Sequence, residues 1–99
     1  MEKLIKRIQA REKQLELSGN VNTELEDTLN SLEKALPEME ELFHYYGSEQ
    51  WYNDREQELP DDVNAGVLSE DLIYDQITQL RDSAYRMLEM ATDILKNRI

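Results

Sequence analysis

The sequence contains no cysteine and a single histidine, His44. Without cysteine, the chain cannot form a disulfide framework or a thiolate metal site. It also lacks a glycine-rich phosphate loop and any other short motif that carries a reaction. We therefore predict a protein that is not an enzyme and that binds no cofactor.

Long apolar runs are absent as well. No stretch approaches the roughly 20 apolar residues that span a bilayer, and the start, MEKLIKRIQAREK, lacks the apolar region of a signal peptide. We expect a cytoplasmic protein. Ninety-nine residues predict a single domain, 1–99, with one small core.

Basic residues are scarce: 11 lysines and arginines against 22 acids give a net charge of −11. Nucleic-acid backbones and anionic membranes attract cationic proteins, so we expect neither as a direct partner. The charge is uneven, because residues 1–17 carry +2, whereas residues 24–41 carry −6 and residues 49–75 carry −8. The acidic segments favour either solubility with pairing to the basic flanks or a basic partner protein.

Apolar residues recur in steps of three and four, which is typical of amphipathic helices that pack side by side. This spacing predicts helices over residues 22–46 and 70–97, and a weaker stripe predicts another over residues 2–18. Residues 47–68 would be an unusually long unstructured connection, and Ser48 resembles a helix cap, so we predict a short helix over residues 49–57. The expected fold is all-α, an antiparallel three-helix bundle with a short extra helix in the second connection.

The few glycines and prolines set the predicted boundaries. Ser18-Gly19-Asn20 is expected to end the first helix, and Thr23 or its neighbour Asn22 to cap the second. Pro37 removes one backbone hydrogen bond, so we expect a kink or break near Leu36. Gly47 is expected to end the helix in the left-handed conformation.

Two stretches, YYGSEQWYND and LPDDVNAGVLSEDLIYD, resemble the signature of a family of small bacterial proteins, the domain of unknown function numbered 4298. The resemblance implies a bacterial, cytosolic protein of about this length. It implies no reaction, ligand or catalytic residue.

Aromatic residues are few, yet four of the seven lie within residues 45–54. Two interpretations stay open: the cluster caps the helical core, or part of it forms a recognition surface with an acidic rim. We expect Tyr46 to be buried, and Trp51 to share a helix face with Arg55 while its indole N–H finds a partner. The predicted partner-binding residues are Tyr45, Trp51, Tyr52, Glu56, Glu58, Asp61 and Asp62.

Two metal sites compete with a solvated acidic surface as interpretations of the acidic residues. Glu41 and His44 have the spacing of carboxylate-bridged di-metal sites, but one histidine would need a second copy of the chain, and both should flank the stripe in solvent. A calcium loop starting at Asp54 fails, because Leu59 stands where glycine is required and Ala65 where glutamate is required. We therefore predict no metal site.

The sequence favours a non-enzymatic protein-binding module of the immunity, antitoxin-like or adaptor type, which includes mimicry of nucleic acid toward a protein that handles it. Two alternatives come from other classes. One is a metal-binding or enzymatic site assembled across a homodimer. The other is a purely structural homo-oligomer, because a third helix longer than the first leaves apolar surface that a second copy or the 47–68 connection must cover.

Overall fold

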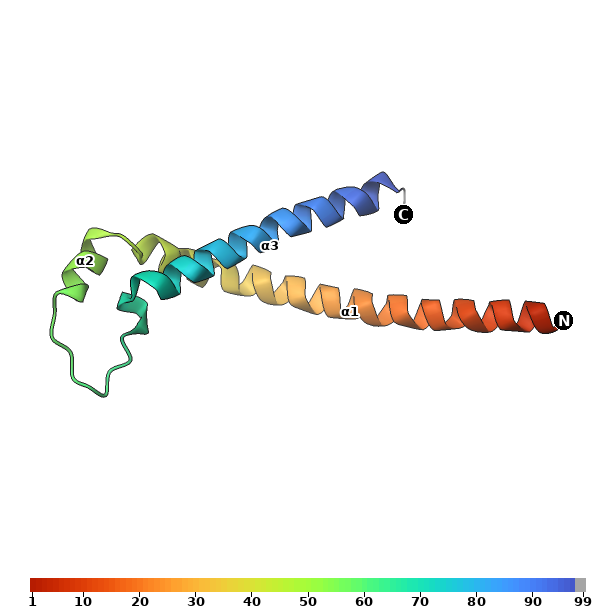
Figure 1. The fold of residues 1–99 in the computed structure, drawn as a ribbon, viewed down its shortest axis with the longest axis horizontal. Coiled ribbons are helices and arrows are strands. Elements are labelled where there is room, and N and C mark those ends of the chain that lie inside the picture. The colour runs from red at the N-terminus through yellow and green to blue at the C-terminus, as the bar shows by residue number, and fades with distance from the viewer. Residues whose placement is uncertain (98–99) are drawn as a thin grey trace. The chain divides into compact units, whose positions relative to one another are not determined.

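The computed structural model describes residues 1–97 and contains only helices and loops within them. The elements are α1 (Glu2–Tyr45), α2 (Glu49–Arg55), a single-turn 3-10 helix η1 (Gly66–Leu68) and α3 (Glu70–Lys96), as Figure 1 shows. No strand occurs in this part of the chain, so the all-α prediction is confirmed.

Helix α1 runs without interruption through the predicted first connection. The break at Ser18-Gly19-Asn20 is therefore wrong, as are the separate helices over 2–18 and 22–46. A single glycine inside a helix costs about 1 kcal/mol relative to alanine, which the helix-forming residues on both sides offset. Thr23 is not a cap, because its hydroxyl donates a hydrogen bond to the Gly19 carbonyl within the same helix, at 3.0 Å.

Pro37 also lies inside α1. Of the kink or break expected near Leu36, the break is therefore wrong, and the kink stays a prediction. Proline lacks the backbone N–H that would bond to the preceding turn, and its ring crowds that turn. The backbone is helical on both sides of the residue.

The chain divides into two units, residues 1–38 and a second unit that begins at Met39. The first unit is purely helical, and none of its side chains is buried. Among the described residues, Trp51 and Ile73 have buried side chains, and both belong to the second unit. The core of the protein is therefore small and lies where α2, η1 and the start of α3 meet.

The second half of the fold follows the sequence-based boundaries closely. The predicted helix 49–57 is α2, which ends two residues earlier, and the predicted helix 70–97 is α3, which ends one residue earlier. Ser69 precedes α3 in an extended conformation, but its side chain makes no capping hydrogen bond. Across residues 1–97, none of the helices is long and apolar enough to cross a membrane.

Candidate protein-interaction site around Trp51

The turn between α1 and α2 is built by two adjacent small residues. Gly47 has φ = +76°, a left-handed conformation that glycine adopts without the steric cost of a Cβ atom. Ser48 then caps α2, because its hydroxyl oxygen accepts a hydrogen bond from the Trp51 backbone N–H at 3.2 Å. Both predicted roles are confirmed, and together they place Trp51 on the first turn of α2.

Trp51 is the most enclosed side chain of the described chain, with 2% of its surface exposed. Its indole N–H donates a hydrogen bond to the Val67 carbonyl at 3.0 Å, as expected for a buried indole that needs an acceptor. Because Val67 belongs to η1, this bond fastens α2 to the segment that precedes α3. The predicted hydrogen bond of the indole is thus confirmed.

Arg55 lies over the ring of the tryptophan. Its guanidinium carbon lies 4.5 Å from the centre of the Trp51 ring, and its Nη1 lies 3.1 Å from Glu70 Oε1. Arg55 therefore shares a helix face with Trp51, as predicted, and joins α2 to the first turn of α3. The Glu70 carboxylate also suits the positive end of the α3 dipole.

Two tyrosines meet the Trp51 ring edge-on. The ring centres of Tyr46 and Tyr52 lie 4.9 Å and 5.0 Å from that of Trp51, with interplanar angles of 61° and 72°. Tyr46 is half-buried, whereas Tyr52 leaves 55% of its surface exposed. The residues that contact Trp51, together with the ion-pair partner of Arg55, form a set that we call the tryptophan hub, made of Tyr46, Trp51, Tyr52, Arg55, Val67 and Glu70.

A second link joins the end of α1 to α2. The Tyr45 hydroxyl donates a hydrogen bond to Asp54 Oδ2 at 2.6 Å. This hydrogen bond, reinforced by desolvation and by the nearby carboxylate charge, raises the pKa of Tyr45 above its ordinary value of 10.0. Tyr45 therefore stays protonated, and able to donate this hydrogen bond, throughout the physiological range.

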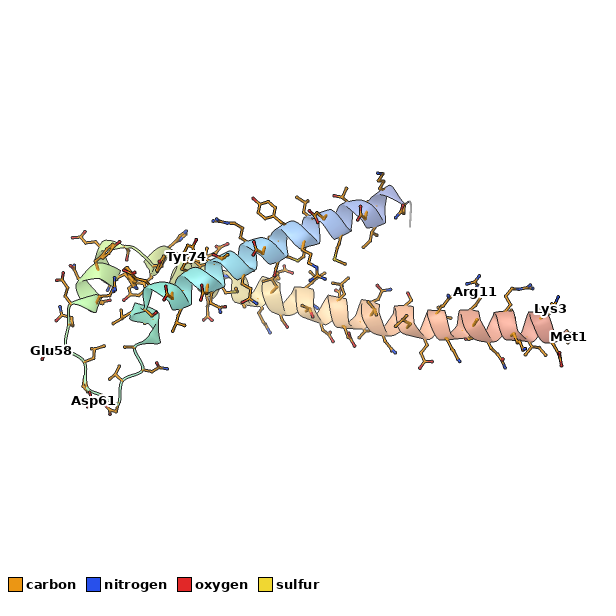
Figure 2. The ribbon with its side chains drawn as sticks, viewed as in Figure 1. Met1, Lys3, Arg11, Glu58, Asp61 and Tyr74 are labelled. Atoms are coloured by element: carbon orange, nitrogen blue, oxygen red, sulfur yellow. The ribbon has the colours of Figure 1, made fainter. Side chains whose placement is uncertain are left out.

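The connection after α2 presents acids to solvent. Residues 56–64, which we call the acidic loop, carry four carboxylates and no base, and all four side chains are exposed: Glu56, Glu58, Asp61 and Asp62. A turn closed by the Val63 N–H and the Pro60 carbonyl at 3.1 Å holds the middle of the loop. Figure 2 shows Glu58 and Asp61 on its outer side.

A mostly apolar hollow of about 270 Å³ lies beside the Tyr45–Asp54 hydrogen bond. Apolar hollows with a polar rim are where protein interfaces concentrate binding energy. The residues that line it come from α1, α2, the acidic loop, η1 and the position between the last two: Tyr45, Asp54, Gln57, Leu59, Val63, Asn64, Ala65, Val67 and Leu68.

The predicted partner-binding residues fall into two groups. Trp51 and Tyr45 point into the fold, where they hold α2, η1 and the end of α1 together. The remaining ones, Tyr52 and the four loop carboxylates, are exposed. Prediction from the sequence missed Val67 and Glu70, because a backbone acceptor and an ion pair 15 or 16 residues away leave no periodic signal.

Glu41 and His44, the pair considered for a di-metal site, are both exposed, as expected. Within residues 1–97, histidine and acidic side chains form no group of three that could hold a metal ion.

The geometry defines a class: an all-α protein whose C-terminal part is organised by one buried tryptophan and borders an exposed acidic loop. Within that class, the chain belongs to the family described as Domain of unknown function (DUF4298), whose model matches residues 2–90. The resemblance found in YYGSEQWYND and LPDDVNAGVLSEDLIYD is therefore confirmed. No curated protein matches the sequence.

Proposed function

We propose that the protein is a non-enzymatic binding module that recognises a basic protein through the acidic loop, Tyr52 and the neighbouring hollow. One observation carries the proposal: four exposed carboxylates follow one another in a loop without any base, at the edge of a mostly apolar hollow. An apolar hollow beside charge of one sign fits a partner surface that presents an apolar side chain among lysines and arginines.

The charges near the loop favour an external partner over internal pairing. Arg55, the nearest base, is already engaged by Glu70 and by the Trp51 ring. No lysine or arginine follows it until Arg81. The negative field of the loop is therefore available to steer a basic protein, and such steering makes association fast and salt-sensitive.

The tryptophan hub supports this role indirectly. It fixes both ends of the loop, because Trp51 holds Val67 and Arg55 holds Glu70. Fixing the ends in advance reduces the conformational entropy lost on binding. In this proposal, Trp51 and Tyr45 position the surface, whereas Tyr52 and the carboxylates contact the partner.

The sequence predicts an antiparallel three-helix bundle. From this prediction, the proposal keeps only that the apolar stripes of the long helices pack against other helices. α1 and α3 each carry an apolar stripe with the spacing that helices use when they pack side by side. We propose that these stripes find helical partners in the working protein, which we place in the cytoplasm.

The test compares two variants that remove the same amount of charge. The loop variant carries Glu56→Gln, Glu58→Gln, Asp61→Asn and Asp62→Asn. The control carries Glu2→Gln, Glu12→Gln, Glu24→Gln and Asp27→Asn, which are exposed positions of α1. Proteins captured from a host lysate by the immobilised wild type are identified and purified, and association rates are then measured with each variant.

The proposal expects a captured basic protein that the control still binds and that the loop variant binds at least about tenfold more slowly. Raising the salt concentration from about 0.1 M to about 1 M shortens the screening length from about 10 Å to about 3 Å and should slow association with the wild type likewise. Equal rates for both variants, or rates insensitive to salt, would refute the acidic loop as the recognition surface.

A further inference from the structure

The continuity of α1 joins two apolar stripes that the sequence seemed to separate. Because residues 2–45 form one helix, the steps of three and four run on through Ser18-Gly19-Asn20 without a change of register. The side chains of the combined stripe within the first unit are Met1, Leu4, Ile8, Arg11, Leu15, Ser18, Asn22, Leu25, Leu29, Leu32 and Leu36.

This stripe is open to solvent over most of its length. Between Leu4 and Leu29, each of its large apolar side chains leaves 42% or more of its surface exposed. Apolar residues at such positions over three or four heptads are typical of a coiled coil, and eight of the eleven stripe positions are apolar. The face therefore has the pattern of a helix–helix interface. α3, at 27 residues, is too short to cover all of the 44-residue α1.

The stripe is self-complementary when two copies run antiparallel with their two-fold axis near Asn20. Leu4 then faces the partner's Leu36, Ile8 faces the partner's Leu32, and Leu15 faces the partner's Leu25. The two polar members meet each other, since Ser18 faces the partner's Asn22. Apart from Arg11, this register thus matches apolar with apolar and polar with polar side chains, and buried polar layers of this kind fix the alignment of paired helices.

Arg11 is the one charged member of the stripe, and in this register it faces the partner's Leu29. Its aliphatic stem can lie along that leucine while the guanidinium reaches the partner's Glu26 or Glu33. In a parallel arrangement, by contrast, Arg11 would face Arg11 of the second copy.

The charge distribution favours the same orientation. Residues 1–17 carry +2 and would lie opposite residues 23–39 of the second copy, which carry −4. Glu12 is an exception, because it comes near the partner's Glu26. A parallel pair would instead place the acidic segments of both copies side by side, and like charges there repel.

We propose that the N-terminal part of α1 is a homodimerisation surface, occupied by the same segment of a second copy in antiparallel orientation. The interface extends from Leu4 to Leu36, about 50 Å at 1.5 Å per residue. It uses a different surface from the acidic loop, so it goes beyond the proposed function and does not depend on it.

The first experiment measures mass by light scattering with matched variants of the full chain. Leu15→Glu and Leu25→Glu each place a charge in the stripe, whereas Gln9→Glu and Asn30→Glu add the same charge beside it. The wild type and the two controls should have about twice the chain mass of 11.7 kDa, whereas dimers of the stripe variants should already dissociate at concentrations about tenfold or more higher than the wild-type dimer does. Trp51 fluorescence checks that the second unit stays folded.

A second experiment tests the register. The double variant Leu15→Glu/Leu25→Lys puts opposite charges into the same layer of the antiparallel dimer, and Leu15→Glu/Leu25→Glu puts like charges there. Positions 15 and 25 are about 15 Å apart along one helix, so they do not pair within a chain. The first double variant should recover the dimer relative to Leu15→Glu, and the second should not.

The third experiment tests orientation, and the cysteine-free sequence allows a single spin label at Lys3→Cys. In the antiparallel dimer, the two labels should be about 50 Å apart, because each lies opposite position 37 of the other copy. A monomeric wild type, equal masses for stripe variants and controls, no recovery in the register test, or labels within about one helix diameter would each overturn the proposal.

Discussion

We expect Trp51 to contribute more to the stability of the second unit than any other described side chain, because it is buried and makes the hydrogen bond that joins α2 to η1. Replacing it with alanine, Trp51→Ala, removes a large apolar side chain and leaves the Val67 carbonyl without its donor. We expect a loss of about 3–5 kcal/mol in the free energy of unfolding, measured by urea denaturation followed by circular dichroism.

The matched control is Tyr52→Ala, which removes a neighbouring ring that is 55% exposed. Its loss should be about 1 kcal/mol or less, since the edge-on contact with Trp51 is the main interaction removed. Equal losses in the two variants would contradict the central position given to Trp51.

Tyr45 provides a prediction about pH. Its pKa is raised in the folded protein by the hydrogen bond to Asp54, so the unfolded chain releases this proton first as the pH rises. The stability that the link contributes is complete below pH 10.0 and is lost as the pH rises through the raised value. In a near-ultraviolet titration, one phenol should ionise later than the others.

Two variants identify that phenol. Tyr45→Phe should remove the late ionisation, and Asp54→Asn should move it toward the ordinary value because the hydrogen bond to a carboxylate is gone. An unchanged titration curve in Asp54→Asn would show that the hydrogen bond does not cause the shift.

At the level of residues, much of the hub was predictable from residues that are close in the sequence. Its contacts between residues that are far apart in the sequence were not predicted. Gly47, Ser48 and the shared face of Trp51 and Arg55 follow from neighbours at most four positions apart. The acceptor for the indole and the partner of Arg55 lie 16 and 15 residues away. These two partners come near Trp51 and Arg55 only when the connection between α2 and α3 folds. No periodic pattern in the sequence encodes that folding.

At the level of elements, two glycines predict opposite effects of the same substitution. Gly19 lies inside α1, and a Cβ atom there would meet nothing within 4 Å, so Gly19→Ala should increase helix stability by about 1 kcal/mol. Gly47 has a left-handed backbone, so Gly47→Ala should destabilise the second unit by about 1–2 kcal/mol.

Circular dichroism measures the first change and Trp51 fluorescence during urea unfolding measures the second. If Gly19→Ala lowered the helix content, α1 would not be continuous at that position, and the helix end predicted at Ser18-Gly19-Asn20 would be correct after all.

The helices themselves were predictable to different degrees. α2 and α3 each begin after a serine, and α3 carries clear periodicity, so the predicted bounds of both agreed within two residues. α1 was divided wrongly, because Ser18-Gly19-Asn20 resembles a helix end in isolation. Thr23 resembles a cap for the same reason, but a hydroxyl can bond back to the preceding turn instead.

At the level of the whole molecule, the two units predict two unfolding transitions. Residues 1–38 have no buried side chain, whereas the second unit contains Trp51 and Ile73. In dilute protein, circular dichroism should therefore report loss of helix at lower urea concentrations than Trp51 fluorescence does. At high protein concentration, the first transition should shift upward if α1 dimerises. Coincident transitions at every concentration would contradict the division into two units.

The position of Arg55 has a consequence for protease digestion. Trypsin cleaves after lysine and arginine, and Arg55 is the one such residue between Lys34 and Arg81. Its side chain is held over the indole ring and by Glu70, so cleavage after it requires this region to open. The rate at which trypsin separates the peptide ending at Arg55 from the peptide beginning at Glu56 therefore measures how often the hub opens in the native protein, without any label or substitution.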